Sequence, residues 1–441
     1  MESSDFAPLS VRLLVHEQSG DVTQRRARNT MNTTMTSQPR EASRPWTEIV
    51  TGFLKVGLTA YGGPAFMGVV QAEFQERRQW VSKPRFLEGV ALVNVLPGAT
   101  AVQLSIFLGY ARAGWGGGLL AGLAFAAPGF CVMLALTLGY AALGVNPIVR
   151  GALYGLGPVV LGIFVVALYR LGRSALRGWL HAGIALAAAF AALATPLGTV
   201  TILMLAGAAG LFLFHSRRIG AAVVIALIVA IALLPLVAWS PIRQSTEAAQ
   251  APSFGSVVRV FATIGAFTFG GALSMIALVE EQVVGRLHWL SAQEFIAGLA
   301  LGQLTPGPVL MVAAYVGYKL LGPIGAVVAA AATFLPSFVL MLAILPAFDR
   351  MRNLGWAKAV IQGVIPSVIG VMVVALTRMA ASAVPDPFAI IVLLATVAVL
   401  MLWHLAPVTA VLAGAVIGVI RNRICDLSAV RAVLCVTPWG R

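Results

Sequence analysis

The sequence predicts an all-α polytopic membrane protein, and its composition and hydropathy carry that prediction. Hydrophobic residues make up 59% of the 441 residues, whereas charged residues make up only 10%, and the mean hydropathy is +0.91. A soluble domain with so little charge could not cover its own surface. Apolar stretches recur from about Thr47 to Ile420, each long enough to cross ~30 Å of hydrocarbon as a helix. They lack the alternating pattern of an outer-membrane barrel.

The positive charge of the chain follows from its placement in a membrane. The formal net charge is +14, and the Lys and Arg residues lie in short loops and tails, as the positive-inside rule requires. We therefore predict a lipid bilayer and no nucleic acid as partner, with part of the charge left to attract an anionic substrate. The three cysteines, Cys131, Cys425 and Cys435, have no metal-ligand or redox spacing. No metal or cofactor is predicted.

The chain divides into two long apolar parts with polar segments around them. We predict a disordered cytoplasmic tail over residues 1–46, a first repeat over 47–240, a linker over 241–256, a second repeat over 257–423 and a C-terminal tail over 424–441. The N-terminal tail is rich in Ser, Thr, Gln and Arg and has no apolar core, so it is not a secretory signal.

An internal duplication is the most informative pattern. The segment that begins at Phe53 returns in outline at Phe261, and the correspondence continues through Gly, Pro and Trp residues at an offset of 208 or 209. Matching positions are Trp80 and Trp289, Phe86 and Phe295, Pro97-Gly98 and Pro306-Gly307, Gly109-Tyr110 and Gly317-Tyr318, and Pro128 and Pro336. Chance similarity between apolar helices would not keep these residues in step, so the chain consists of two homologous repeats.

The hydropathy pattern predicts about 12–13 transmembrane segments, with uncertain ends. The first half is expected to span near 47–70, 86–111, 115–142, 149–170, 178–195, 197–214 and 219–239, and the second near 257–280, 294–319, 322–346, 358–380, 387–402 and 405–420. An odd number of spans before the second repeat would invert it relative to the first.

The distribution of arginines tests this topology. Most basic loops fall on one side, which should be cytoplasmic. Two groups conflict, one from Arg77 to Arg85 and one from Arg421 to Arg431. The first conflict disappears if the first helix of each repeat is re-entrant, and the second if the last short pair of helices does not cross twice.

Paired glycine and proline breaks inside apolar helices are the candidate substrate site. Proline removes a backbone donor and glycine lowers helix stability, so free N–H groups and a positive helix end would face a cavity, where an anion is the natural ligand. Packing kinks are the alternative. The predicted substrate-binding residues are Gly62, Gly63, Pro64, Pro97, Gly98, Thr100, Gly270, Gly271, Thr305, Pro306 and Gly307. Lys55, Arg77, Arg78 and Arg112 are predicted electrostatic helpers.

Other polar residues in the spans are candidates of a second kind. Asn94, Gln103, Gln303 and Gln362 could bind ligand or join helices. Glu73, Glu280 and Glu281 could accept a coupling proton or be solvated helix ends, and Arg112 and Lys319 end equivalent helices. No HExxH, Walker or GxSxG motif occurs in a suitable context, so we do not expect an enzyme.

These motifs resemble the chromate ion transporter family, long two-domain branch. The resemblance rests on Phe53–Pro64, Glu73–Ser82, Pro97–Gln103 and Gly109–Gly114, with Thr305–Pro308 before Gly317-Tyr318 as the second-half counterpart. It covers roughly residues 47–420. The chain departs from the family pattern at Ala99, where a second proline is usual, and this leaves the shape of that break open.

The resemblance implies a secondary transporter in the bacterial inner (plasma) membrane that exports chromate and confers chromate resistance. The alternative is a transporter of sulfate or another oxyanion, because chromate is a tetrahedral dianion shaped like sulfate. A proton is the expected coupling ion, and a homodimer is compatible with the sequence.

Overall fold

The computed structural model describes residues 45–59, 63–143, 146–237, 251–269, 272–347, 355–403 and 406–427, in which helices are joined by short connections and no β-strand occurs. Ile49–Arg441 forms one compact unit. The predicted tails, most of the predicted linker, and Gly62, Gly270 and Gly271 lie outside the described residues.

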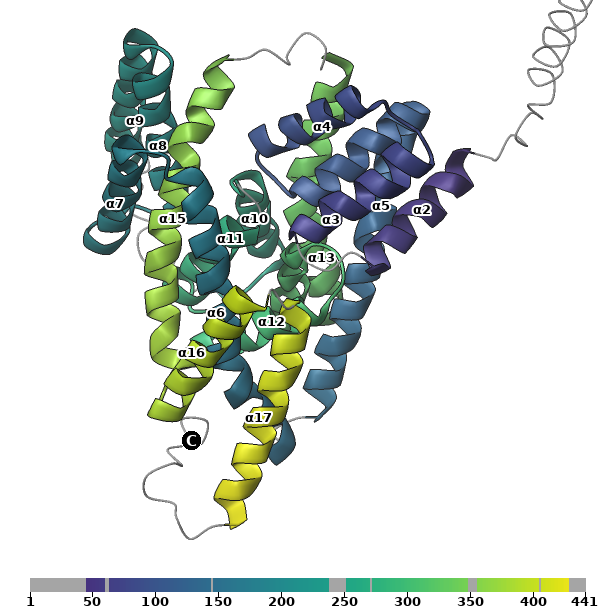
Figure 1. Cartoon of the computed structure of the whole chain (residues 1–441). Helices are drawn as coiled ribbons and strands as arrows, with labels where there is room; N and C mark the ends of the chain where they lie inside the picture. Colours follow the sequence, from purple (N-terminus) through teal and green to yellow (C-terminus); the bar gives the residue numbers. More distant parts are fainter. Residues whose placement is uncertain are drawn as a thin grey trace, which may run out of the picture. The chain divides into compact units, whose positions relative to one another are not determined.

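The helices of the two halves follow the same order (Figure 1). The first half contains α2 (Pro45–Thr59), α3 (Gly63–Val70), the π-helical η1 (Gln71–Arg77), α4 (Lys83–Val95), α5 (Thr100–Leu143), α6 (Pro147–Ala175), α7 (Trp179–Ala194), α8 (Thr199–Phe214) and α9 (Arg217–Val237). The second contains α10 (Phe254–Ala266), α11 (Ala272–Val279), the π-helical η2 (Glu280–Arg286), α12 (Ala292–Leu304), α13 (Val312–Ile344), α15 (Gly355–Ala383), α16 (Pro387–Leu402) and α17 (Pro407–Leu427), with the 3₁₀ turns η3 (Val309–Met311) and η4 (Leu345–Ala347).

Backbone geometry supports the duplication independently of residue type. Gln79 and His288 both have positive φ, 52° and 50°, a conformation uncommon outside glycine. They are 209 residues apart, the offset of the repeat. The positive-φ glycines pair in the same way, Gly98 with Gly307 and Gly114 with Gly322. The two halves therefore share unusual turns as well as helices.

Both long helices contain a sharp reversal. The backbone leaves helical geometry at Ala113-Gly114 in α5 and at Leu321-Gly322 in α13. A Cβ on Gly109 would overlap Gly117 and Ala121, so the short arm of α5 before the turn lies back along the long arm after it. The predicted separation of 86–111 from 115–142 is therefore confirmed.

The two repeats are inverted. Gly118 faces Leu342, and four residues further along the long arm of α5, Gly122 faces Phe338. The contact thus moves forward along α5 while it moves backward along α13, so these equivalent helices pack antiparallel. This confirms the inverted arrangement that the sequence predicted.

The predicted continuous spans 47–70, 86–111, 257–280 and 294–319 are wrong in one respect: each break reverses the chain. Phe53 of α2 stacks on Phe74 of η1, with ring centroids 4.3 Å apart. Gly89 of α4 lies against the ring of Phe107 in the short arm of α5. The first half therefore begins with two helical hairpins, α2 with α3–η1 and α4 with the short arm of α5, and the predicted break at Pro97-Gly98 is the tip of the second.

The second hairpin recurs in the second half, where Gly298 of α12 lies against the ring of Tyr315 in the short arm of α13. Lys319 Nζ also lies 2.8 Å from Glu294 Oε1, which joins the end of this short arm to the start of α12. Five described helices are long and apolar enough to cross a membrane: α5, α6, η3–α13–η4, α15 and α17 up to Ile424. Shorter apolar helices include α7, α8, α10 and α16.

The hairpins remove the first conflict in the arginine pattern. Because α2 and η1 form a hairpin, Arg77 and Arg78 return to the end of the unit from which α2 starts. The guanidinium of Arg112 lies 6.0 Å from the ring of Trp80, at this same end. Arg421, in the second conflict, has a side chain only 11% exposed and forms an ion pair with Asp386, so its charge is largely shielded from solvent.

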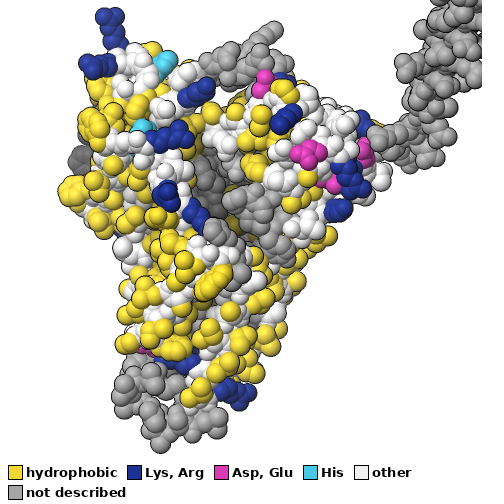
Figure 2. All heavy atoms as spheres, in the orientation of Figure 1, with side chains coloured by type: hydrophobic (Ala, Val, Ile, Leu, Met, Phe, Trp, Pro, Cys, Tyr) yellow, Lys and Arg dark blue, Asp and Glu magenta, His cyan; other side chains and the backbone are white. Residues whose placement is uncertain are grey.

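The halves exchange their final helices. α6 of the first half packs on α16 and α17, and α15 of the second half packs on α7 and α8 (Figure 1). Glycines allow this close approach, Gly155 facing Gly414 and Gly418 in one pair of helices, and Gly363 facing Gly210 in the other. Hydrophobic side chains cover much of the outer face (Figure 2), as expected of a surface in contact with lipid.

A partly buried polar cluster joins α6 to α16 and α17. The hydroxyl of Tyr154 on α6 donates to the carboxylate of Asp386, at the start of α16, over 2.5 Å. Arg421 of α17 donates to the same carboxylate over 2.7 Å, and its guanidinium lies 4.0 Å from the centre of the Tyr154 ring. One carboxylate thus joins three helices from both halves.

We expect Tyr154→Phe to lower the free energy of unfolding by about 1.5–3 kcal/mol, because it removes a buried hydrogen bond to a charged group. Thermal unfolding of the purified protein in detergent measures this. Tyr169→Phe, on the same helix but 50% exposed, is the matched control and should have little effect. Equal melting temperatures for Tyr154→Phe and the native protein would contradict the assigned role of the cluster.

Candidate functional site

The second break of the first half lies against the second half. The N–H of Gly98 donates to the carbonyl oxygen of Thr268 over 2.6 Å. The N–H of Ala99 donates to Ser337 Oγ over 2.9 Å. Thr268 precedes the predicted break at Gly270, so two predicted breaks from opposite halves are brought together here.

The second break of the second half mirrors this contact. The carbonyl oxygen of Gly57 lies 3.7 Å from the position that a Cβ on Gly307 would take. A Cβ on Gly129 would lie 2.6 Å from the carbonyl oxygen of Pro306. The tip at residues 97–99 therefore packs on the end of α10 and on the long arm of α13, and the tip at residues 305–308 packs on α2 and on the long arm of α5.

The first turn of α5 provides donors at this junction. The backbone N–H groups of Thr100, Ala101 and Val102 precede the first intrahelical bond, from Gln103 N to Ala99 O at 2.8 Å. Gln103 is fully buried, and its Nε2 donates to the carbonyl of Pro97 over 2.6 Å. Its Oε1 is buried without a hydrogen-bond partner. Of the four neutral polar candidates, Gln103 is buried beside a break and Gln303 is partly buried two residues before Thr305, whereas Asn94 and Gln362 are exposed.

The other predicted site residues have different surroundings. Thr305 is buried, and its hydroxyl donates to the carbonyl of Gly302 over 2.7 Å. Gly63 and Pro64 begin α3. Ser337 and Thr268 were missed by the sequence reasoning. Ser337 had one signal: it replaces Gly129 at the matching position of the repeat.

The predicted electrostatic helpers do not line the breaks. Lys55 is exposed on α2. Arg77 and Arg78 both contact the carboxylate of Glu73, at 3.3 Å and 2.8 Å. With Arg112, these arginines lie at the ends of the hairpins opposite the tips, about 20 Å away along a 13-residue helix.

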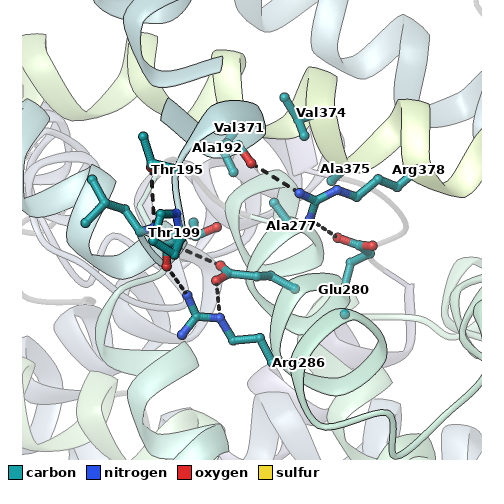
Figure 3. Close-up of a pocket in the computed structure, with 14 residues that line it drawn as sticks. Ala192, Thr195, Thr199, Ala277, Glu280, Arg286, Val371, Val374, Ala375 and Arg378 are labelled. Atoms are coloured by element: carbon teal, nitrogen blue, oxygen red, sulfur yellow. Dashed lines mark hydrogen bonds and ion pairs between the residues drawn. The ribbon is translucent and has the colours of Figure 1, made fainter. Parts of the chain in front are cut away.

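A second cluster of charged residues surrounds a cavity of about 240 Å³ between α11–η2, α15 and the α7–α8 connection (Figure 3). Arg286 Nε lies 2.9 Å from Glu281 Oε1, and Glu281 Oε2 accepts a 2.7 Å hydrogen bond from the N–H of Thr199 at the start of α8. Glu281 is therefore held by an arginine and by a helix N-terminus, where a carboxylate is favoured.

Glu280 is bound far less tightly than its neighbour. Its side chain is only 6% exposed, and its ion pair, to Arg378, is 3.9 Å long, beyond hydrogen-bond distance. Glu280 lies outside the five candidate membrane spans. Burial raises the pKa of its carboxyl to about 7; Arg378 acts to lower this pKa and Glu281 to raise it. This carboxyl can therefore exchange a proton near neutral pH.

Arg378 and Arg170 are equivalent, and both join the two halves. Arg378 donates to the carbonyl of Ala192 on α7 over 3.2 Å, and Arg170 donates to that of Leu400 on α16 over 2.9 Å. Donors and acceptors are each separated by 208 residues. The equivalent of Glu280 is Gln71. The sequence reasoning missed Arg378, although its offset from Arg170 was a usable signal.

Comparison with known proteins agrees with this architecture. A family model described as chromate transporter matches residues 47–211 and again 255–419. The chain is 31% identical to the chromate transport protein of Cupriavidus metallidurans over 83% of this chain and 91% of that protein. It is 34% identical to the chromate transport protein of Pseudomonas aeruginosa over 74% of this chain and 79% of the relative. No solved structure matches the chain.

Proposed function

Because the chain belongs to the chromate transporter family, we propose that this multi-pass membrane protein is a secondary transporter that exports chromate across the bacterial inner membrane and so confers chromate resistance. The relatives are named for chromate transport. Export from the cytoplasm, coupling to protons and chromate resistance of the cell all belong to this proposal.

The meeting of hairpin tips from inverted halves carries the proposal. The tips around Gly98 and Gly307 each pack on the opposite half. Inverted repeats that meet at broken helices can open alternately to the two sides. N–H groups at the start of α5 would replace water around the oxyanion, and the positive end of the helix dipole would stabilise its charge. Gly62, Gly63, Pro64, Gly270 and Gly271 complete the proposed path.

The basic end of the first half would raise the local concentration of anions. Arg77, Arg78 and Arg112 lie at this end with Arg85, whose guanidinium is 5.9 Å from the Phe107 ring. Charges at a pathway entrance act on encounter rate and are screened by salt.

We therefore expect Arg112→Gln to lower the initial rate of chromate transport about twofold at low ionic strength, with the difference lost at high salt. Arg112→Lys, which keeps the charge, is the control. Stopped-flow or rapid-filtration transport assays at two salt concentrations measure the effect. A defect that is equal in both salts would indicate a structural role instead.

The function is tested with inverted membrane vesicles that contain the protein. Export in the cell corresponds to accumulation in these vesicles. We expect radiolabelled chromate to accumulate above the level in empty vesicles, and excess unlabelled sulfate to compete weakly. If sulfate accumulated and chromate showed no net flux, the substrate would be sulfate and not chromate. Absence of flux for either oxyanion would overturn the proposal.

A further inference from the structure

The cavity beside η2 presents a buried acid and an arginine that are only loosely paired. We propose that the Glu280 carboxylate and a tetrahedral oxyanion compete for the Arg378 guanidinium, so that binding of the oxyanion in this cavity takes up one proton. This inference rests on the proposed oxyanion transport and names the device that would couple it to protons.

Geometry separates the two neighbouring glutamates. Glu281 accepts bonds from Arg286 and from the N–H of Thr199, both shorter than 3.0 Å. In the described part of the chain, the charged partner of Glu280 is Arg378, at 3.9 Å. Removal of charge from Glu281 would leave Arg286 and a helix N-terminus without their anion. Protonation of Glu280 disrupts no hydrogen bond within the described part of the chain. Glu280 is therefore the acid whose charge can change at low cost.

Arg378 is placed to receive an anion from the cavity. One of its amino groups donates to the carbonyl of Ala192, which fixes the guanidinium in position, and another faces Glu280 (Figure 3). The space of about 240 Å³ is several times the ~30 Å³ share of one water molecule, so it accommodates a tetrahedral oxyanion with water. Arg378 and Arg286 give the cavity two guanidinium groups, the side chain best suited to such oxygens.

The charge balance requires the proton. Among the described residues, the titratable groups around Glu280 in this cavity are Glu281 and Arg286 from η2 and Arg378 from α15. Thr195 of the α7–α8 connection and Thr199 at the start of α8 also line the cavity and carry no charge. Two acids balance two arginines. A dianion placed there would meet two carboxylates, and transfer of a proton from water to Glu280 removes one of them. The proton stays on Glu280 while the anion is bound, and no covalent bond forms.

The first half offers a matched control. Arg170 makes the same contact with the opposite half as Arg378 does, but Gln71 stands at the position of Glu280. The amide of Gln71 donates to Glu76 over 3.1 Å. Arg170 thus has the structural part of the arrangement without the competing acid, so only the second half is expected to respond to protons.

Calorimetric titration of the purified protein with chromate, in buffers of different ionisation enthalpy, tests the proposal. Between about pH 6 and pH 8, we expect native affinity to fall up to about tenfold per pH unit, with one proton taken up per anion. For Glu280→Gln, the chromate affinity should vary less with pH, and one proton fewer should be taken up for each chromate bound. Chromate's own protonation is common to both proteins and cancels in this difference. Arg170→Lys should leave the proton count unchanged.

Equal numbers of protons taken up by the native protein and by Glu280→Gln would overturn the inference. An unchanged number of protons taken up by Arg378→Ala would also overturn it. Glutamine has nearly the same shape as glutamate, so Glu280→Gln should fold, and its melting temperature checks this. The number of protons that the variant takes up per chromate then tests the inference. Chromate flux in native vesicles combined with equal proton counts would refute the coupling device and leave the proposed function intact. No chromate flux and no chromate binding in the native protein would refute both.

Discussion

Substitution of Gly98 by alanine is expected to lower chromate transport about 100-fold, because it displaces a hairpin tip from its seat on the other half. Gly98 has φ +124°, a conformation that residues with a Cβ rarely adopt. The added Cβ would overlap Ser337 Oγ and would lie 2.6 Å from Gln103 Nε2. Ser337 Oγ accepts a hydrogen bond from Ala99, and Gln103 Nε2 donates one to Pro97. Movement of these groups to relieve the overlap would therefore shift the backbone of the tip. Vesicle transport at equal protein level measures the loss.

Two further variants show whether the loss comes from this contact. Gly139→Ala in α5 is the control, since a Cβ there has nothing within 4 Å. The double variant Gly98→Ala/Ser337→Gly removes the overlapping hydroxyl and leaves the φ strain, so it should regain part of the activity through a non-additive effect. The loss of transport in the double variant could instead equal the combined losses of the two single variants. That result would exclude steric conflict at Ser337 as the cause.

The local features of the fold could be predicted from the sequence because they depend on neighbouring residues. Proline and glycine both lower helix stability, so the paired breaks at Pro97-Gly98 and Pro306-Gly307 could be identified, although the helices continue through Pro158 and Pro366. The offset of 208 or 209 residues identified the repeat. Hydropathy does not distinguish one continuous helix from two half-length arms that reverse at the break, since the apolar content is the same. The hairpins at Phe53–Phe74 and Gly89–Phe107 therefore required the structure.

The charged cavity could not be predicted, because it depends on the exchange of helices between halves. Thr199, Glu280 and Arg378 come from three distant parts of the chain, and only the packing of α15 on α7 and α8 brings them together. From sequence, Arg378 was an arginine near the end of an apolar helix, where long basic side chains commonly extend to the interface. Its partner carbonyl on Ala192 belongs to the other half.

Glycines lie where α15 packs on α8 and where α6 packs on α17. The close approach of these helices leaves no space for larger residues. Gly363 of α15 faces α8, where an ideal Cβ would overlap the carbonyl oxygen of Ala206 and lie 2.9 Å from Gly210 N. Gly155 of α6, 208 residues earlier, faces Gly414 and Gly418 of α17 in the same way. These neighbours are backbone atoms, so a rotamer change cannot relieve the overlap, and the helices themselves must separate.

We therefore expect Gly363→Leu to destabilise the folded protein by at least about 3 kcal/mol, through overpacking and loss of contact between α15 and α8. Gly183→Ala in α7 is the control: nothing lies within 4 Å of its Cβ position, and alanine favours a helix over glycine by about 1 kcal/mol. The two substitutions should thus shift the melting temperature in detergent in opposite directions. A native melting temperature for Gly363→Leu would mean that the exchange of helices does not hold the halves together. Loss of stability in Gly363→Leu should also open the cavity beside Arg378, because that arginine and Gly363 lie on the same helix.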